Sequence, residues 1–280
     1  MQTATTDLEA KPASRKAETS TPLSALRAHW PEFLMEGAEL GLFMVSACFF
    51  TALLEHPSSP AWQANVLLRR FLEGLAMGLT LLALVFSPWG KRSGAHMNPA
   101  FTLSFYLLGK VERWDAVFYA IAQFAGGILG VVFSILVIGA PVRHAAVNYV
   151  VTVPGPGGPP IALAGEFIIS LMQMSAVLVV SNHKRLSRFT PFVAATLLAT
   201  YITFEAPLSG MSMNPARTLG SALPAHVWTA LWVYFLAPPV AMALAGQLYR
   251  FRRGAHRVFC AKLHHHNDER CIFRCNYAAM

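Results

Sequence analysis

The chain has 280 residues, of which 55% are hydrophobic and 13% carry a charge. This composition excludes an ordinary soluble protein and predicts a membrane protein. The formal net charge of +8 requires no nucleic-acid partner, because the orientation of a membrane protein accounts for an excess of Lys and Arg.

The N-terminal stretch, residues 1–28, is polar, rich in Thr, Ala and Ser, and lacks the apolar core of a signal peptide. We therefore expect a disordered tail. Six later stretches are long and apolar enough to span a membrane: 32–54, 67–87, 114–139, 160–181, 189–206 and 226–249. The pattern predicts an all-α membrane protein of six transmembrane helices with both termini on one side.

The basic residues are distributed unequally between the two sides that these spans define. Most of the 22 Lys and Arg fall in the two tails, beside the first motif described below, or in the fourth connection, whereas Arg69, Arg70 and Arg143 lie opposite. The positive-inside rule then predicts cytoplasmic termini. We expect an integral multi-pass protein of the cell (inner) membrane. Glu73 lies one turn after Arg69 and Arg70, so we expect it to form an ion pair with them.

One tripeptide occurs twice, each time interrupting an apolar helical pattern: Asn98, Pro99, Ala100 and Asn214, Pro215, Ala216. Asn is a favoured helix N-cap and Pro suits the first helical position, so each tripeptide predicts the start of a helix. The apolar run 101–108 predicts a helix about 15 Å long. Because a hydrocarbon core is about 30 Å thick, each motif predicts a re-entrant half-helix.

The two motifs lie in halves of opposite orientation. The first follows span two and the second follows span five, so an odd number of crossings separates them. This predicts an inverted repeat, with a first repeat over 29–140 and a second over 160–250, in a channel domain of residues 29–250. Broken helices that meet at the midplane of an inverted repeat are an architecture of membrane transport proteins.

At the two motifs the sequence resembles the aquaporin or major intrinsic protein family, in a bacterial-type form. The matching stretches are 93–103 and 209–218, and the resemblance covers about residues 30–250. It implies an hourglass of six transmembrane helices and two half-helices in an inverted repeat. It also implies a homotetramer in the lipid bilayer, with one pore for each subunit.

Four polar side chains are expected to shape the centre of such a pore. If backbone at their own caps holds the Asn98 and Asn214 side chains, the remaining amide hydrogens can donate to a passing solute oxygen. The membrane-embedded carboxylates of Glu36 and Glu166 have two interpretations. They couple transport to protons, or they accept hydrogen bonds from the loop backbone near each half-helix. The resemblance favours the second interpretation.

The resemblance also implies a narrow ring that sets selectivity. It places Ile202, Met211 and Arg217 in this ring, and its fourth position falls on Met77 or, without a one-residue insertion, on Gly78. A strict water channel of the family usually has an aromatic residue and a His in the ring, and neither is found at these positions. Residues after the second motif and in span six instead resemble the water-selective branch: Thr218, Ala222, Tyr234 and Phe235. The alternative for Met77, Met211 and Ile202 is ordinary core packing.

The basic C-terminal tail, residues 251–280, concentrates thiol and imidazole groups within sixteen residues: Cys260, His264, His265, His266, Cys271 and Cys275. Such a density can bind Zn²⁺ or a similar soft metal. The alternative is a basic tail near anionic lipid. The spacing matches no zinc-finger type that we can name.

We therefore predict a transporter and not an enzyme, because no nucleophile and base pair, phosphate loop or transmembrane metal cluster is visible. The expected function is a passive channel for water and small neutral solutes that excludes protons and ions and requires no cofactor. The alternatives are a glycerol or small-solute facilitator of the same fold, an ion-coupled carrier that uses Glu36 and Glu166, and a silent-pore structural or sensory protein.

Overall fold

The computed structural model describes residues 21–280, and the tail predicted for 1–28 therefore lies mostly outside the described residues. The end of that stretch corrects the prediction, because helix α1 (Pro22–Glu55) already begins at Pro22. The Thr21 side chain accepts from the Ser24 backbone N–H and the Ser24 side chain accepts from the Thr21 N–H. This reciprocal cap satisfies donors that a helix start leaves unpaired.

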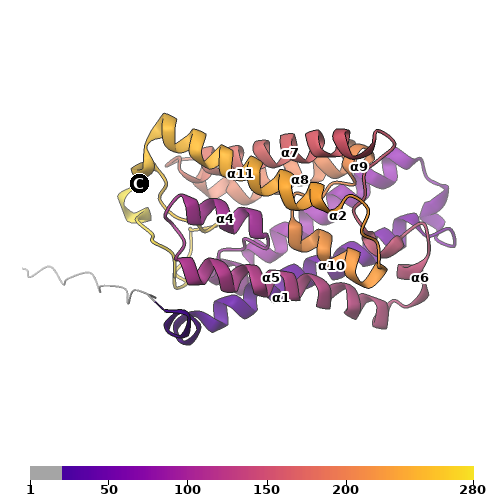
Figure 1. Cartoon of the computed structure of the whole chain (residues 1–280), viewed down its shortest axis with the longest axis horizontal. Helices are drawn as coiled ribbons and strands as arrows, with labels where there is room; N and C mark the ends of the chain where they lie inside the picture. The colour runs from indigo at the N-terminus through magenta and orange to yellow at the C-terminus, as the bar shows by residue number, and fades with distance from the viewer. Residues whose placement is uncertain (1–20) are drawn as a thin grey trace, which may run out of the picture.

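Six long helices run along the long axis and match the six predicted spans (Figure 1). They are α1, α2 (Val66–Phe86), α5 (Arg113–Val137), α7 (Gly158–Ser181), α8 (Thr190–Phe204) and α11 (Leu231–Arg253). Four of them, α1, α5, α7 and α11, are long and apolar enough to cross a membrane by length and composition. Helix α2 carries three charges in its first half, and α8 has only 15 residues. The prediction of an all-α membrane protein is confirmed.

The two half-helices are α4 (Pro99–Leu107) and α10 (Pro215–Ala225). Each begins with Pro and has the motif Asn as its N-cap. At 1.5 Å per residue they are about 14 and 17 Å long. Helix α4 lies in the half of the bundle that carries the C-terminus, and α10 lies in the other half (Figure 1). The two halves of the chain thus each contribute one short helix to the interior.

Close helix packing relies on small residues. Where α1 crosses α5, a Cβ added to Gly126 would lie 1.9 Å from the Gly37 carbonyl oxygen, so only glycine permits this approach. Lipid supplies no hydrophobic force between helices, and close backbone contact through small residues is one way in which membrane helices associate. The outward faces carry large exposed apolar side chains, such as Leu129 on α5 and Leu136 near its end.

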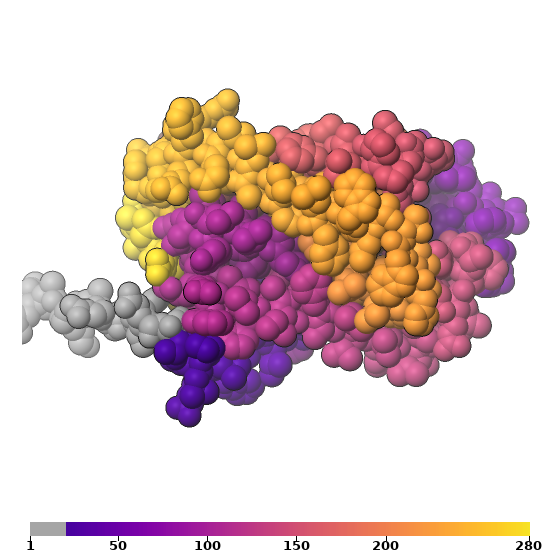
Figure 2. Space-filling view, viewed as in Figure 1, coloured from indigo at the N-terminus to yellow at the C-terminus, as the bar shows by residue number. Residues whose placement is uncertain are grey.

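The remaining elements are short: η1 (Pro60–Gln63), α3 (Pro88–Ser93), α6 (Ala140–Arg143), η2 (Asn148–Val150), η3 (Ser187–Phe189), α9 (Ala206–Ser209), η4 (Ala255–Arg257) and η5 (Tyr277–Ala279). Residues 254–280, here called the C-terminal segment, fold back onto one end of the bundle instead of extending from it. This end is called the tail face. Figure 2 shows the segment packed beside α4 at that end.

Candidate functional site: a cavity between two half-helices

The loops that precede the half-helices, residues 94–98 and 210–214, have the same unusual backbone. Gly94 and Gly210 have φ values of 98° and 79°. Two non-glycine residues in each loop also have positive φ: Ala95 and Met97, Met211 and Met213. L-residues in this region cost of order 1–3 kcal/mol each, so the surroundings must hold them there.

A buried carboxylate holds each loop. Glu36 on α1 accepts hydrogen bonds from the His96 and Met97 backbone N–H groups, both at 2.7 Å. Successive N–H groups in such a backbone form a concave anion site, and a carboxylate fills it. Glu36 therefore accepts hydrogen bonds from the loop backbone, as the second of the two interpretations in the sequence analysis expects.

Glu166 on α7 does the same in the second repeat. Its two oxygens accept from the Ser212 and Met213 N–H groups, at 2.6 and 2.7 Å. The Ser209 hydroxyl also donates to Glu166, as the Ser93 hydroxyl donates to Glu39 in the first repeat. The inverted repeat therefore extends from the motif to the side chains that support it.

The two motif asparagines link the half-helices to each other. The Asn98 Oδ1 accepts from the Ala100 N–H, and its Nδ2 donates to the Met213 carbonyl at 2.7 Å. The Asn214 Nδ2 donates to the Met97 carbonyl, also at 2.7 Å. Since an amide nitrogen has two hydrogens, each side chain keeps one donor after these bonds.

A cavity of about 320 Å³ passes between these two asparagines. It extends from Glu55 and Arg70, near the end opposite the tail face, to Leu263 of the C-terminal segment. Both Asn98 and Asn214 line it, whereas neither Glu36 nor Glu166 does. The carboxylates therefore support the loops from behind and do not face the cavity.

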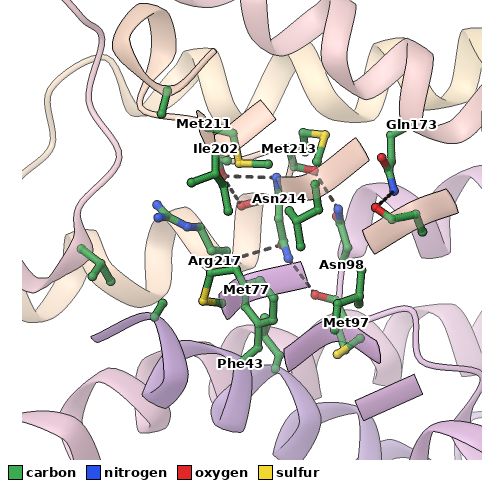
Figure 3. Close-up of a pocket in the computed structure, with 18 of the residues that line it drawn as sticks. Phe43, Met77, Met97, Asn98, Gln173, Ile202, Met211, Met213, Asn214 and Arg217 are labelled. Carbon is green, nitrogen blue, oxygen red and sulfur yellow. Dashed lines mark hydrogen bonds between the residues drawn. The ribbon is translucent and has the colours of Figure 1, made fainter. Parts of the chain in front are cut away.

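The residues predicted for the selectivity ring all line this cavity: Met77, Ile202, Met211 and Arg217. Figure 3 shows them gathered on one side of the two asparagines. Gly78 instead faces α8, where an added Cβ would lie 3.1 Å from the Ala195 carbonyl oxygen. Of the two residues considered for the fourth position, only Met77 reaches the cavity. The Arg217 Nη1 is buried and has no hydrogen-bond partner among the described residues.

The prediction that Glu73 forms an ion pair with Arg69 and Arg70 is wrong. Arg69 pairs with Glu55, at 3.1 Å, and not with Glu73. Glu73 accepts a hydrogen bond from Thr51 and lines the cavity. Sequence reasoning had not assigned this carboxylate to the wall. A helical spacing would have found it, because Arg70, Glu73, Met77 and Leu81 recur every three or four residues along α2.

The C-terminal segment brings together four of the six predicted metal ligands. The ligand atoms of Cys260, His265, Cys271 and Cys275 all lie within 4.8 Å of one another. His264 instead packs on Phe86, and His266 contacts Ser187 and Tyr277, so these two side chains lie outside the group.

Proximity changes the ionisation of this cluster. Hydrogen bonds with Cys260 and Cys271 hold the pKa of the Cys275 thiol far below its ordinary value. Burial lowers the pKa of His265, but its contacts with Cys271 and Cys275 outweigh this and raise it to about 9. The His265 Nε2 lies 3.0 Å from the Cys275 sulfur.

Comparison with known proteins matches residues 21–249 to the family described as Major intrinsic protein. Among relatives, Aquaporin NIP1-4 of Oryza sativa subsp. japonica is 35% identical over 180 residues, covering 64% of each chain. Aquaporin A of Dictyostelium discoideum is 30% identical over 240 residues, covering 82% of this chain and 80% of that protein. The chain thus spans just under two thirds of the length of the rice relative. The plant and Dictyostelium relatives do not bear out the expectation of a bacterial-type member.

Among solved structures, the aquaglyceroporin from Plasmodium falciparum aligns with a TM-score of 0.65 and 20% sequence identity. The alignment covers 79% of this chain and 95% of that one. At this identity the likeness establishes the fold and nothing beyond it.

Proposed function

This chain belongs to the major intrinsic protein family, and we propose that it forms a passive membrane channel for water and small neutral solutes. The observation that carries the proposal is the cavity that passes between the Asn98 and Asn214 caps. Irregular backbone at membrane depth is tolerated where protein buries it or a wet cavity solvates it. The mechanism needs no catalytic group and no cofactor.

The midplane contacts support selective passage of neutral molecules. The N-termini of α4 and α10 contribute about half a positive charge each. The spare amide hydrogens of Asn98 and Asn214 can both donate to one solute oxygen. A water molecule that accepts both has no lone pair left to accept a hydrogen bond from a neighbouring water at that point, so it relays protons poorly while it passes.

Exclusion of ions is assigned to Arg217 together with this midplane field. Its unpaired Nη1 offers a donor to a passing solute oxygen, and its charge repels cations. The alternative of an ion-coupled carrier loses support because both of its required carboxylates, Glu36 and Glu166, are bound to loop backbone and lie outside the cavity wall.

Facilitated transport of glycerol is a second candidate. It is favoured by the apolar side chains of Met77, Ile202 and Met211, which line the cavity beside Arg217. An apolar wall opposite one donor group suits a solute with a carbon backbone and hydroxyl groups on one side. The residues that resemble the water-selective branch, Thr218 and Ala222 among them, favour water instead.

The proposal also includes the orientation of the chain in the membrane and its oligomeric state. The tail face is assigned to the cytoplasm of a cell membrane, because most Lys and Arg lie on that side. The assembly is a homotetramer with one pore per subunit, as the family resemblance implies. Native mass spectrometry in detergent tests the assembly, and a dominant monomer would contradict it.

Stopped-flow light scattering on proteoliposomes tests the channel itself. Purified protein should raise osmotic water flux with the low activation energy of a pore, independently of any proton or sodium gradient. Glycerol flux is measured beside it. Shrinkage as slow as in protein-free liposomes, both for the protein as purified and after treatment with a metal chelator, would support a silent pore, and a response to an imposed ion gradient would support a carrier. Glycerol passing as readily as water would favour the second candidate.

A further inference from the structure

The four clustered side chains have the composition and spacing of a tetrahedral zinc site. Zn–S and Zn–N bonds of about 2.3 and 2.0 Å place the ligand atoms of such a site roughly 3.5–3.8 Å apart. The Cys260 and Cys271 sulfurs are 3.6 Å apart, and all four ligand atoms lie within 4.8 Å. The two sulfurs are too distant for a disulfide bond, which requires about 2.05 Å.

The charges around the cluster suit a bound dication. Three thiolates and one neutral imidazole leave a net charge of about −1 when they hold Zn²⁺. The Lys262 ammonium, which is 4% exposed, donates to the Glu269 and Arg270 carbonyls beside Cys271, and the Lys110 ammonium donates to the Arg274 carbonyl and the Asn276 side chain beside Cys275. The Tyr277 backbone N–H also lies 3.5 Å from the Cys275 sulfur. Such outer contacts orient and stabilise thiolate ligands.

A bound metal would also stabilise the fold of the C-terminal segment. Apart from η4 and η5 it has no regular secondary structure, yet it buries several apolar side chains: Val258, Phe259, Ala261, Leu263, Ile272 and Phe273. Short irregular segments rarely stabilise a fixed fold through their own core, and a structural metal commonly supplies the missing free energy. The ligand residues lie between and beside these buried side chains in the sequence, so one ion would fix the whole segment.

This segment lies across the tail-face end of the cavity. Leu263 lines the cavity, and its backbone N–H donates to the Gly94 carbonyl at 3.1 Å. The His96 Nε2 donates to the Ala261 carbonyl at 2.9 Å, and the Phe273 ring stacks on His96 with the centroids 5.2 Å apart. The segment is therefore bonded directly to the loop that leads into α4.

Further contacts tie the segment to the connections around the opening. The Phe259 N–H donates to Asn182 after α7, and Arg274 forms a two-point ion pair with Glu112 before α5. The Arg270 guanidinium donates to the Ala28 carbonyl on α1. The segment is thus bonded to α1, to the connection after α7 and to the residue that precedes α5.

We propose that Cys260, His265, Cys271 and Cys275 bind one Zn²⁺, and that the metal holds the C-terminal segment as a plug across the tail-face mouth of the cavity. The closure rests on the proposed channel function, whereas the metal site does not. Loss of the ion releases the segment from Gly94 and His96 and opens the path at Leu263.

The metal site is tested on the full-length protein by zinc content and by the thiolate-to-cobalt absorption of the Co²⁺ form. We expect one zinc per chain, lost in His265→Asn and in Cys275→Ser. His264→Asn and Cys48→Ser are matched controls that should keep it, since His264 lies beside the cluster without joining it and Cys48 is buried in α1. Zinc absent from the parent, zinc retained by both ligand variants, or a Cys260 to Cys271 disulfide would overturn the site.

Closure is tested by water flux into liposomes with added Zn²⁺ or with a zinc chelator. Coupling between two sites typically shifts an equilibrium by about 5- to 150-fold. A chelator that shifts the plug from closed to open by such a factor should raise the flux measurably above that of the zinc-loaded protein. Leu263→Ala shortens the plug without touching a ligand, so it should keep its zinc and conduct in both conditions.

The outcomes separate the two proposals. Flux that is above background but unaffected by chelation and by Leu263→Ala would overturn the closure and leave the channel intact. Flux at the level of protein-free liposomes in every variant would overturn both the closure and the channel function, while one zinc per chain would still support the site.

Discussion

Replacing Glu166 with Ala tests whether the buried carboxylates hold the pore loops. The change removes the acceptor of the Ser212 and Met213 backbone N–H groups, which now bond at 2.6 and 2.7 Å. A buried backbone donor left unsatisfied costs about 1–3 kcal/mol, so the two together predict a loss of about 2–6 kcal/mol. Met211 and Met213 would then relax from their positive φ values, and the Asn98 bond to the Met213 carbonyl would weaken with them.

The assay combines thermal unfolding in detergent, followed by tryptophan fluorescence, with water flux in liposomes. We expect Glu166→Ala to lower both the unfolding temperature and the flux. Glu166→Gln keeps one acceptor oxygen and should lose about half as much stability. The matched variant Glu36→Ala, which frees the His96 and Met97 N–H groups, should behave like Glu166→Ala. Unchanged stability and flux in Glu166→Ala would refute the supporting role.

The same variants separate this role from proton coupling. A carrier that used Glu166 would respond to an imposed pH gradient in the parent and lose that response in Glu166→Gln. The supporting role predicts no such response in either protein, because Glu166 lies outside the cavity wall. A gradient-driven flux that disappears in Glu166→Gln would show that the carrier interpretation is correct.

Arg217→Val should preserve water flux but admit small cations, since one charge within about 5 Å of a passing cation raises its barrier by about 3 kcal/mol at an effective dielectric constant of about 20. Dissipation of an imposed pH gradient measures this, and a variant as tight as the parent would assign the barrier to the midplane field alone. Gly126→Ala places a Cβ 1.9 Å from the Gly37 carbonyl oxygen and should lower the unfolding temperature by separating α1 from α5, at a cost of about 1–3 kcal/mol, whereas the outward-facing Leu129→Ala should change it little; equal effects would refute this packing argument.

Local patterns in the sequence were sufficient to predict the six long helices and the two half-helices. Apolar stretches of spanning length predicted six helices, because lipid requires each crossing segment to satisfy its own backbone. The caps at Asn98 and Asn214 were predictable for a similar reason, since N-capping depends on residues next to one another in the chain. The resemblance carried by these motifs also indicated the family.

Contacts between distant parts of the chain were decided only by the tertiary structure. Glu36 bonds to a loop 60 residues away, and the rotation of α2 about its axis turns Met77 toward the cavity and Gly78 toward α8. Arg69 pairs with Glu55 at the end of α1 and not with Glu73 one turn along its own helix, a choice that the packing of α1 beside α2 decides. Sequence spacing alone does not settle these details, because a small turn of a helix exchanges the residues that face the pore.

The C-terminal segment shows most clearly which features follow from the sequence and which depend on the tertiary structure. Its composition by itself determined that thiol and imidazole groups are dense enough to bind a soft metal. Only the folded chain separated His265, which joins the three cysteines, from His264 on Phe86 and His266 at Ser187. Adjacent residues in an irregular segment point in directions that no periodicity predicts, so the choice among three consecutive histidines depends on the bundle against which the segment packs.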